Sequence, residues 1–326
     1  MTSVLNIQMT TAASHPPTAS LSSAWSALPP EYAIPDRAPE LAEAREYCRR
    51  LARSHYENFS VASWFLPKHL REHFFNVYAY CRISDDLGDE VGDSAASLLL
   101  LDQWQTELDA CYDGHPRHPV FVALAETVRM FQIPRYEFSD LLTAFRQDQR
   151  IGRYETFHDL LGYCRYSANP VGHLVLYLCG YRDLERQTLS DYTCTALQLA
   201  NFWQDVTADF ARGRIYLPLE DMRRFGVGEE DIRAGNNTPA FRELMKFEVQ
   251  RAREWFAQGL PLAVKVDRAL ATDIELFSRG GLEILNAIKR QNYAVLGNRP
   301  SISKSRKLGL VGRAALGKLL GKKEKR

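Results

Sequence analysis

The most chemically distinctive residues of this 326-residue sequence are two pairs of aspartates. Asp85 and Asp89 are four residues apart, and so are Asp205 and Asp209. On a helix each pair therefore lies on one face, where two carboxylates repel each other unless a cation lies between them. Oxygen ligands without a neighbouring His or Cys cluster favour Mg²⁺, which is usually held by a few carboxylates, water and substrate phosphates. The pairs therefore predict a magnesium–diphosphate site.

Each pair is accompanied by other polar residues on the same helical face. Tyr78 and Arg82 precede the first pair at helical spacing, and Gln198 and Asn201 precede the second. Polar side chains on an apolar helix need partners when they are buried. Two such helices facing each other would form a pocket of four carboxylates and an amide. For either segment alone, a solvated acidic helix end or a polar network that only fixes packing remains an alternative.

A pocket of this kind suits the ionisation of a diphosphate ester. Metal ions neutralise the leaving diphosphate, the carbon–oxygen bond breaks, and a carbocation is left behind. Such a cation requires a long, dry cavity lined by aromatic rings, because aromatic faces stabilise cations without attacking them. The 15 Tyr, 16 Phe and 5 Trp can supply that lining, although most of them are expected in the core.

Helices must position these residues, because strand patterns are scarce along the chain. Helical periodicity, punctuated by Gly and Pro, is found at ten places. The predicted helices lie near residues 40–55, 67–90, 95–112, 118–131, 135–150, 156–165, 170–180, 188–212, 238–258 and 261–292. The pattern predicts an all-α, single-domain helical bundle with a central apolar cavity.

The two ends of the chain differ in composition from the middle. Residues 1–39 are rich in Ala, Ser, Thr and Pro and are predicted to be a flexible leader, whereas residues 40–303 form the catalytic domain. Residues 304–326 carry nine Lys or Arg against one acid, Glu324, with leucines at helical spacing. We expect this basic amphipathic tail to contact an anionic membrane surface peripherally, and a disordered basic terminus is the alternative.

The overall composition excludes several other classes of protein. The 41 basic and 40 acidic residues nearly cancel, so no nucleic-acid partner is expected. No apolar run approaches the roughly 18–20 residues of a membrane-spanning helix. Six scattered cysteines and the lack of a secretory signal indicate reduced thiols. The predicted location is cytoplasmic, with peripheral attachment at the inner face of the membrane through the tail.

Taken in order, several segments resemble the squalene/phytoene synthases, which join two isoprenyl diphosphates head to head. The resemblance covers roughly residues 41–304. The matching segments are residues 54–59, 78–89, 152–157, 163–172, 198–209 and 213–218. It implies an isoprenoid-synthase fold, an isoprenyl diphosphate substrate, two or three Mg²⁺ ions with the diphosphate, and other squalene-pathway enzymes as partners.

The resemblance also implies roles for individual residues. The metal ligands would be Asp85, Asp89, Asn201, Asp205 and Asp209, and the four aspartates and Tyr78 would be catalytic. Residues from both halves of the chain would bind the substrate. These are His55, Phe59, Tyr78, Arg82, Arg165, Gln198, Gln204 and Arg214. On the residues alone, His55 could equally be a core or capping histidine.

Three positions depart from the general family pattern. Gln204 stands where many relatives have Arg, while Arg165 and Gly281 stand where some have Tyr. We expect Gln204 to lower the positive charge around the diphosphate and Gly281 to open space for a water. Together with the run at residues 54–64, these departures are most similar to the bacterial hydroxysqualene synthase branch. That branch ionises presqualene diphosphate and lets water capture the rearranged cation.

NADPH is not expected, because no Gly-x-Gly-x-x-Gly follows a strand, although reductive squalene synthases bind it on this fold. The main alternative is condensation of two farnesyl diphosphates to presqualene diphosphate or squalene, or a phytoene synthase-like transfer. The Asp-Asp-x-x-Asp pattern of residues 85–89 also fits a trans-type prenyl chain elongator, but the second acidic segment does not. A non-enzymatic, basic-tailed membrane or nucleic-acid adaptor would leave the converging polar residues unexplained.

Overall fold

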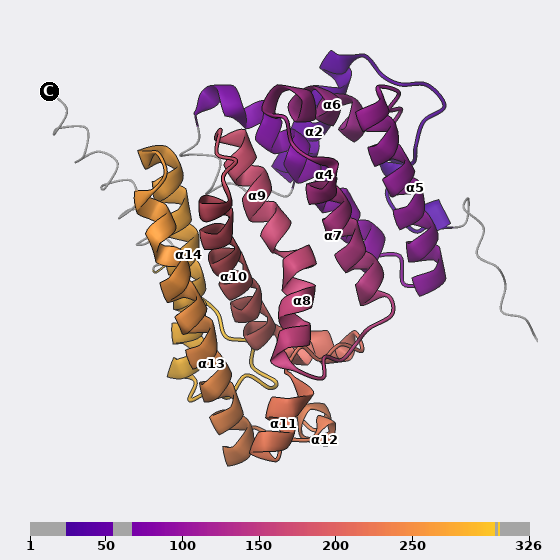
Figure 1. Cartoon of the computed structure of the whole chain (residues 1–326). Coiled ribbons are helices and arrows are strands. Elements are labelled where there is room, and N and C mark those ends of the chain that lie inside the picture. The colour runs from indigo at the N-terminus through magenta and orange to yellow at the C-terminus, as the bar shows by residue number, and fades with distance from the viewer. Residues whose placement is uncertain (1–23, 55–66, 304–305, 307–326) are drawn as a thin grey trace, which may run out of the picture.

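The computed structural model describes residues 24–54, 67–303 and Arg306, and in these ranges the chain is helical (Figure 1). In chain order the helical elements are η1 (Pro30–Tyr32), α2 (Leu41–Ser54), η2 (Lys68–Leu70), α4 (Arg71–Asp89), α5 (Ser94–Asp113), α6 (Pro119–Phe131), α7 (Arg135–Asp148), α8 (Phe157–Ser167), α9 (Asn169–Leu178), α10 (Leu184–Ala211), α11 (Leu219–Phe225), α12 (Glu229–Arg233), α13 (Pro239–Gly259), η3 (Leu260–Val264) and α14 (Arg268–Arg290). An isolated bridge between Arg153 and Ile215 is the one β pairing in these ranges. The predicted all-α fold is confirmed.

Most predicted helix limits agree with the structure to within a few residues. The predicted helix over 261–292 is interrupted, because η3 ends at Val264 and a new helix, α14, begins after Asp267. The Asp267 carboxylate accepts the backbone N–H groups of Ala269 and Leu270, which is the usual N-cap arrangement. The short helices α11 and α12 were not predicted, because neither is long enough to show a helical repeat.

Residues 24–39 do not behave as the predicted flexible leader. Ala24, Leu28 and Tyr32 are buried in the same hydrophobic cluster as α4, α5 and α6. The Tyr32 hydroxyl donates a hydrogen bond of 2.8 Å to Asp86 Oδ2 on α4. Apolar residues interspersed among the prolines anchor this segment to the bundle. The predicted leader therefore extends too far, because residues 24–39 pack with the helical core. The first 23 residues lie outside the described part.

Two helices, α4 and α10, form the centre of the bundle. The long α10 packs against α9, α13 and α14, whereas α4 packs against α2, α5, α6, α7 and α9. Figure 1 shows α9 passing between these two groups of helices. Both acidic pairs stand at the C-terminal ends of their helices, since α4 ends at Asp89 and α10 ends at Ala211. The fold therefore brings the ends of α4 and α10 to one site.

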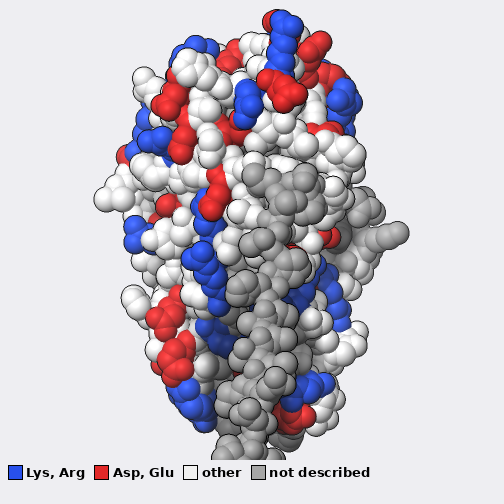
Figure 2. Space-filling view, turned by 90° about the vertical axis from the view of Figure 1, so that its right-hand side faces the viewer, with Lys and Arg blue, Asp and Glu red and all other residues white. Residues whose placement is uncertain are grey.

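The helices of the described part offer no candidate for crossing a bilayer, because none is long and apolar enough. Figure 2 shows the face at the right-hand side of Figure 1, where basic and acidic side chains are interspersed.

Candidate active site

Arg214 links the ends of the two acidic helices. One of its terminal nitrogens, Nη2, lies 3.0 Å from Asp89 Oδ1 at the end of α4. Arg212 Nη1 lies 3.4 Å from the other oxygen of Asp89. Because both arginines directly follow α10, these contacts hold the end of α10 against the end of α4. The structure thus brings the two predicted acidic segments together.

The four aspartates crowd negative charge into this end of the bundle. Burial raises the pKa of Asp85 from 3.8 to about 6, and Asp89 adds to the effect. Burial likewise raises the pKa of Asp209 from 3.8 to about 7, with further contributions from Asp205 and, across the gap between the helices, from Asp89. Helix C-termini also carry a partial negative charge, which opposes carboxylates placed there. A bound cation would stabilise this arrangement.

The donor set fits Mg²⁺ held jointly by protein and diphosphate. No three acidic, histidine or cysteine side chains of the described residues gather closely enough to hold an ion by themselves. Each helix instead offers a pair of carboxylates, from Asp85 and Asp89 on α4 and from Asp205 and Asp209 on α10. Mg²⁺ usually takes one or two carboxylates and completes its shell with water and phosphate oxygens. The residues present match that requirement.

Arg82 and Tyr78 line the approach to the acids along α4. Arg82 forms an ion pair with Asp86 and lies 3.5 Å from Asp85 Oδ2. Because Asp86 is buried and also accepts from Tyr32, it fixes the Arg82 guanidinium beside Asp85. Burial raises the pKa of the half-buried Tyr78, so its phenol stays protonated at neutral pH.

A further carboxylate, the partly buried Asp148, interacts electrostatically with Arg214. The hydroxyls of Tyr163 and Tyr216 donate to Asp148, at 2.7 and 3.3 Å. Burial raises the pKa of Asp148 to about 6, and Arg214 opposes this rise. Burial lowers the pKa of Arg214, but the nearby Asp148, Tyr216 and Asp89 outweigh it and raise the pKa. Arg214 therefore remains a fixed cation at the site.

The chain after α14 returns to the acidic end of α10. Arg299 forms a two-point ion pair with Asp205, in which Nη2 lies 2.9 Å from Oδ2. The amide of the buried Gln204 donates to the backbone carbonyl of Pro300 at 2.5 Å. In this structure Gln204 therefore anchors the returning segment and does not join the facing acids. Arg299 supplies a positive charge next to the position where we expected its loss.

The remaining predicted site residues make no described contact with the four aspartates. Asn201 is exposed and Gln198 is half-buried, on the same stretch of α10 as the second acidic pair. Arg165 is exposed on α8, with its guanidinium 5.6 Å from the centre of the Tyr166 ring, and no described contact links it to the acids. His55 and Phe59 lie outside the described residues.

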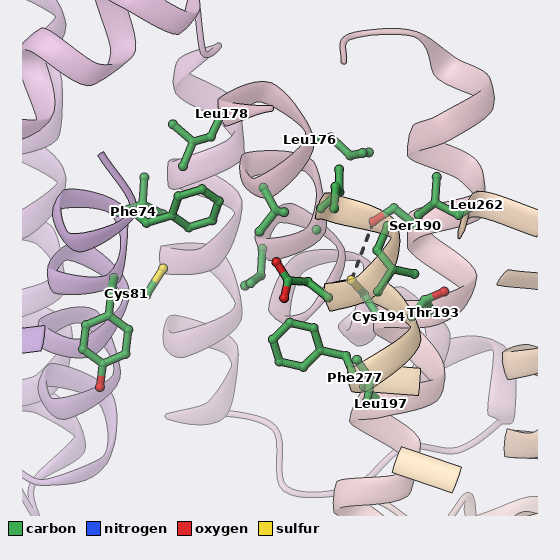
Figure 3. Close-up of a pocket in the computed structure, with 18 residues that line it drawn as sticks. Phe74, Cys81, Leu176, Leu178, Ser190, Thr193, Cys194, Leu197, Leu262 and Phe277 are labelled. Atoms are coloured by element: carbon green, nitrogen blue, oxygen red, sulfur yellow. Dashed lines mark hydrogen bonds between the residues drawn. The ribbon is translucent and has the colours of Figure 1, made fainter. Parts of the chain in front are cut away.

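An apolar cavity of about 320 Å³ adjoins the Tyr78 side of the site. Helices α4, α9, α10 and α14 and the turn η3 contribute its walls, and Figure 3 shows Phe74 and Cys81 facing Ser190, Cys194 and Leu262 across it. The lining residues are Phe74, Val77, Tyr78, Cys81, Val171, Gly172, Val175, Leu176, Leu178, Ser190, Thr193, Cys194, Leu197, Leu262, Leu270, Asp273, Ile274 and Phe277. The cavity can hold a hydrocarbon chain beside Tyr78, on the helix that carries the first acidic pair.

Gly281 does not open this cavity, contrary to the prediction from the sequence. It is buried in α14, and a Cβ placed on it would lie 2.9 Å from Leu197 Cδ2 and nearer still to Phe256 Cζ. The Phe256 ring from α13 therefore fills the space beside the glycine. The identity of that neighbour could not be read from the spacing of residues on α14.

Several residues of the site were missed in the sequence. Arg212 had a local signal, because it follows Asp209 by about one helical turn. Asp148 and Arg299 had none beyond their residue type, since each reaches the site through packing between distant elements. A carboxylate on the apolar face of the α14 pattern was the one available sign for Asp273.

Comparisons with known proteins identify the family to which this sequence and fold are similar. A profile of the squalene/phytoene synthase family matches residues 52–306. The phytoene synthase of Arthrospira platensis is 32% identical over 284 residues, which cover 82% of this chain and 91% of that protein. The structure of squalene synthase HpnC from Alicyclobacillus acidocaldarius has a TM-score of 0.75 at 46% identity, covering 83% of this chain and 98% of that one. A dehydrosqualene synthase in complex with ligand has a TM-score of 0.77 at 28% identity, covering 85% and 96%.

Proposed function

We propose that this protein is a hydroxysqualene synthase. The proposal starts from the family: the chain belongs to the squalene/phytoene synthases and is an enzyme acting on isoprenyl diphosphates. In this reaction presqualene diphosphate and water give hydroxysqualene and diphosphate. The observation that carries the proposal is the position of an apolar cavity on the Tyr78 side of an acid-rich helix end. Similarity at 46% identity to squalene synthase HpnC supports the squalene side of the family.

The residues divide the work between binding and ionisation. Asp85, Asp89, Asp205 and Asp209, with Asn201, would hold Mg²⁺, which when bound neutralises the charge that develops on the departing diphosphate. Arg214 and Arg82 are held by Asp89 and Asp86, so their guanidinium groups are oriented before substrate arrives. Preoriented cations of this kind lower the cost of charge separation in the transition state.

The cavity then controls the fate of the carbocation. Its walls are mostly aliphatic and aromatic, and the faces of Phe74 and Tyr78 can stabilise a cation without forming a bond to it. The product depends on which group reaches the cation first. In the proposed reaction that group is a water molecule, and NADPH takes no part.

A second candidate function is the condensation of two farnesyl diphosphates, and one observation favours it. Two diphosphates need dense positive charge, and the structure places Arg212, Arg214 and Arg299 beside the acids. Arg299 thus offsets the positive charge that Gln204 lacks, which favours a site able to hold a second diphosphate.

Product analysis separates these functions. The purified protein is supplied with Mg²⁺ and either presqualene diphosphate or farnesyl diphosphate, with and without NADPH, in H₂¹⁸O. Hydroxysqualene carrying the heavy oxygen, formed from presqualene diphosphate without NADPH, supports the proposal. Squalene formed only with NADPH, or accumulation of presqualene diphosphate from farnesyl diphosphate, would contradict it and support the condensation.

A further inference from the structure

One carboxyl group stands in the wall of the apolar cavity. Asp273 of α14 is 3% exposed and lines the cavity together with Leu270, Ile274 and Phe277. These four residues share one face of the helix, and the other three are apolar. Among the described residues of the lining it is the sole carboxyl group.

A carboxyl group in such a wall changes what the cavity can hold. Burying a carboxyl group among hydrocarbon costs several kcal/mol unless polar groups accompany it. Its two oxygens offer about four acceptor positions, which are enough to bind water beside other partners. Buried water in proteins is found where polar groups of this kind provide hydrogen bonds. Asp273 therefore gives an otherwise apolar wall one place suited to an ordered water.

The other heteroatoms of the lining are poorly suited to accept a proton. Burial raises the pKa of Cys81 to about 12 and that of Cys194 to about 11, so both thiols are protonated at neutral pH. Ser190 Oγ lies 3.8 Å from the sulfur of Cys194, and Thr193 donates to a backbone carbonyl of its own helix. Hydroxyl groups are in any case weak bases. Among the described lining residues, the carboxyl group of Asp273 is the one group that, when ionised, can take a proton released inside the cavity.

We propose that Asp273 positions the water that captures the carbocation and accepts the proton released in that step. The step rests on the proposed function. The carbon–oxygen bond of presqualene diphosphate breaks and its electron pair leaves with the diphosphate. After the cation rearranges, a lone pair of the water oxygen forms the new carbon–oxygen bond. One O–H bond of that water breaks, and its proton passes to the carboxylate of Asp273, which returns it to solvent.

The test compares the products of three variants with those of the wild type. Asp273→Asn keeps the shape of the side chain but removes the base, and Asp273→Leu removes its polarity altogether. Glu275→Gln is the matched control, because Glu275 lies two residues away on the same helix, is exposed and pairs with Arg279. Each protein receives presqualene diphosphate and Mg²⁺. Diphosphate release, hydroxysqualene and hydrocarbon products are measured separately, and circular dichroism checks that each variant is folded.

Removal of a general base typically costs about 10²–10⁴-fold in the step that it assists. We expect the share of hydroxysqualene among the products of both Asp273 variants to fall about tenfold or more. Diphosphate release should stay within about threefold of the wild type, because ionisation precedes capture. Hydrocarbons formed by proton loss from the cation should replace the alcohol, and Glu275→Gln should give the wild-type product ratio.

Two results would overturn the assignment of Asp273. One is an unchanged share of hydroxysqualene in both variants. The other is loss of diphosphate release in parallel with the alcohol, which would place Asp273 before water capture. If the wild type itself makes no hydroxysqualene from presqualene diphosphate, the proposed function fails, and that outcome is distinct because it appears before any substitution is made.

Discussion

Arg299, which follows α14, pairs with Asp205 near the end of α10, so the last described segment of the chain covers one of the proposed metal ligands. Gln204, the residue before that aspartate, holds the same segment through the carbonyl of Pro300. The two adjacent residues of α10 therefore do different things: Gln204 anchors the segment, and Asp205 receives its cation.

The first prediction concerns Arg299→Gln. The Arg299 guanidinium neutralises Asp205, so its removal should tighten Mg²⁺ binding in the absence of diphosphate. The Arg299 side chain is 59% exposed, and pairs of this kind are weak, so we expect up to about a fivefold change. Isothermal titration of the substrate-free protein with MgCl₂ measures it. Arg290→Gln is the control, because it removes a similarly exposed cation that pairs with Glu283 instead. Weaker binding in Arg299→Gln would contradict the prediction.

The second prediction concerns the aspartates. Asp85→Asn and Asp205→Asn should each lower turnover by about 10²-fold or more, because each removes a proposed metal ligand. Thermal stability should stay equal or rise, since a repelling carboxylate is lost. Coupled diphosphate-release assays and thermal melts provide the measurements, with the exposed Asp102→Asn as the control. Turnover that survives excess EDTA, or that persists in both variants, would refute the metal assignment.

The third prediction uses two adjacent glycines of α14. Gly281→Ala should lower the free energy of unfolding by about 1–3 kcal/mol, because the new Cβ would overlap Phe256 and Leu197. Gly280→Ala is the matched control, since nothing lies within 4 Å of its Cβ position. There, alanine should stabilise the helix by about 0.5–1 kcal/mol. Urea denaturation distinguishes the two, and equal effects would show that the space beside Gly281 is open.

The fourth prediction concerns His173, which bridges Glu137 and Asp191 with distances of 3.0 and 2.7 Å. Burial lowers the pKa of His173, but the hydrogen bonds to both carboxylates outweigh it and raise the pKa from 6.5 to about 9. A raised folded-state pKa contributes stability that is fully present below pH 6.5 and is lost as the pH rises to about 9. The bridge should therefore contribute roughly 2–3 kcal/mol at pH 6 and little above pH 9.

The difference in unfolding free energy between wild type and His173→Gln isolates this contribution. Burial raises the pKa of Glu248 to about 8, which is in the same pH range. Because Glu248 is present in both proteins, its contribution cancels in the difference. The exposed His158→Gln serves as the control. A difference that stays constant from pH 6 to pH 9.5 would show that the bridge does not carry an imidazolium.

The fifth prediction concerns residues 304–326, which apart from Arg306 lie outside the described residues. We expect the full chain to sediment with vesicles containing phosphatidylglycerol, and a chain truncated after Ser303 to stay largely in solution. Each basic residue near an anionic surface adds up to about 1 kcal/mol, and salt should weaken the binding. Vesicles of phosphatidylcholine alone are the control. Equal sedimentation of both proteins on anionic vesicles would refute docking through the tail.

The sequence alone sufficed for the parts of this protein that depend on local spacing. The helical periods predict the helices, and Asp85 with Asp89 and Asp205 with Asp209 must share a face at a spacing of four. The order of segments also indicates the family, because the same residue types recur at the same places along the chain. None of these inferences requires knowledge of which helices are neighbours.

Tertiary structure decided what each face meets. The side chain of Gln204 contacts Pro300, 96 residues away, and Tyr32 reaches Asp86 across 54 residues. The ring of Phe256 fills the space beside Gly281, where the glycine alone suggested an opening. Spacing along one helix determines which side chains point together, but their neighbours come from elements distant in sequence. Those partners are selected by the packing of the whole bundle, and no local pattern encodes them.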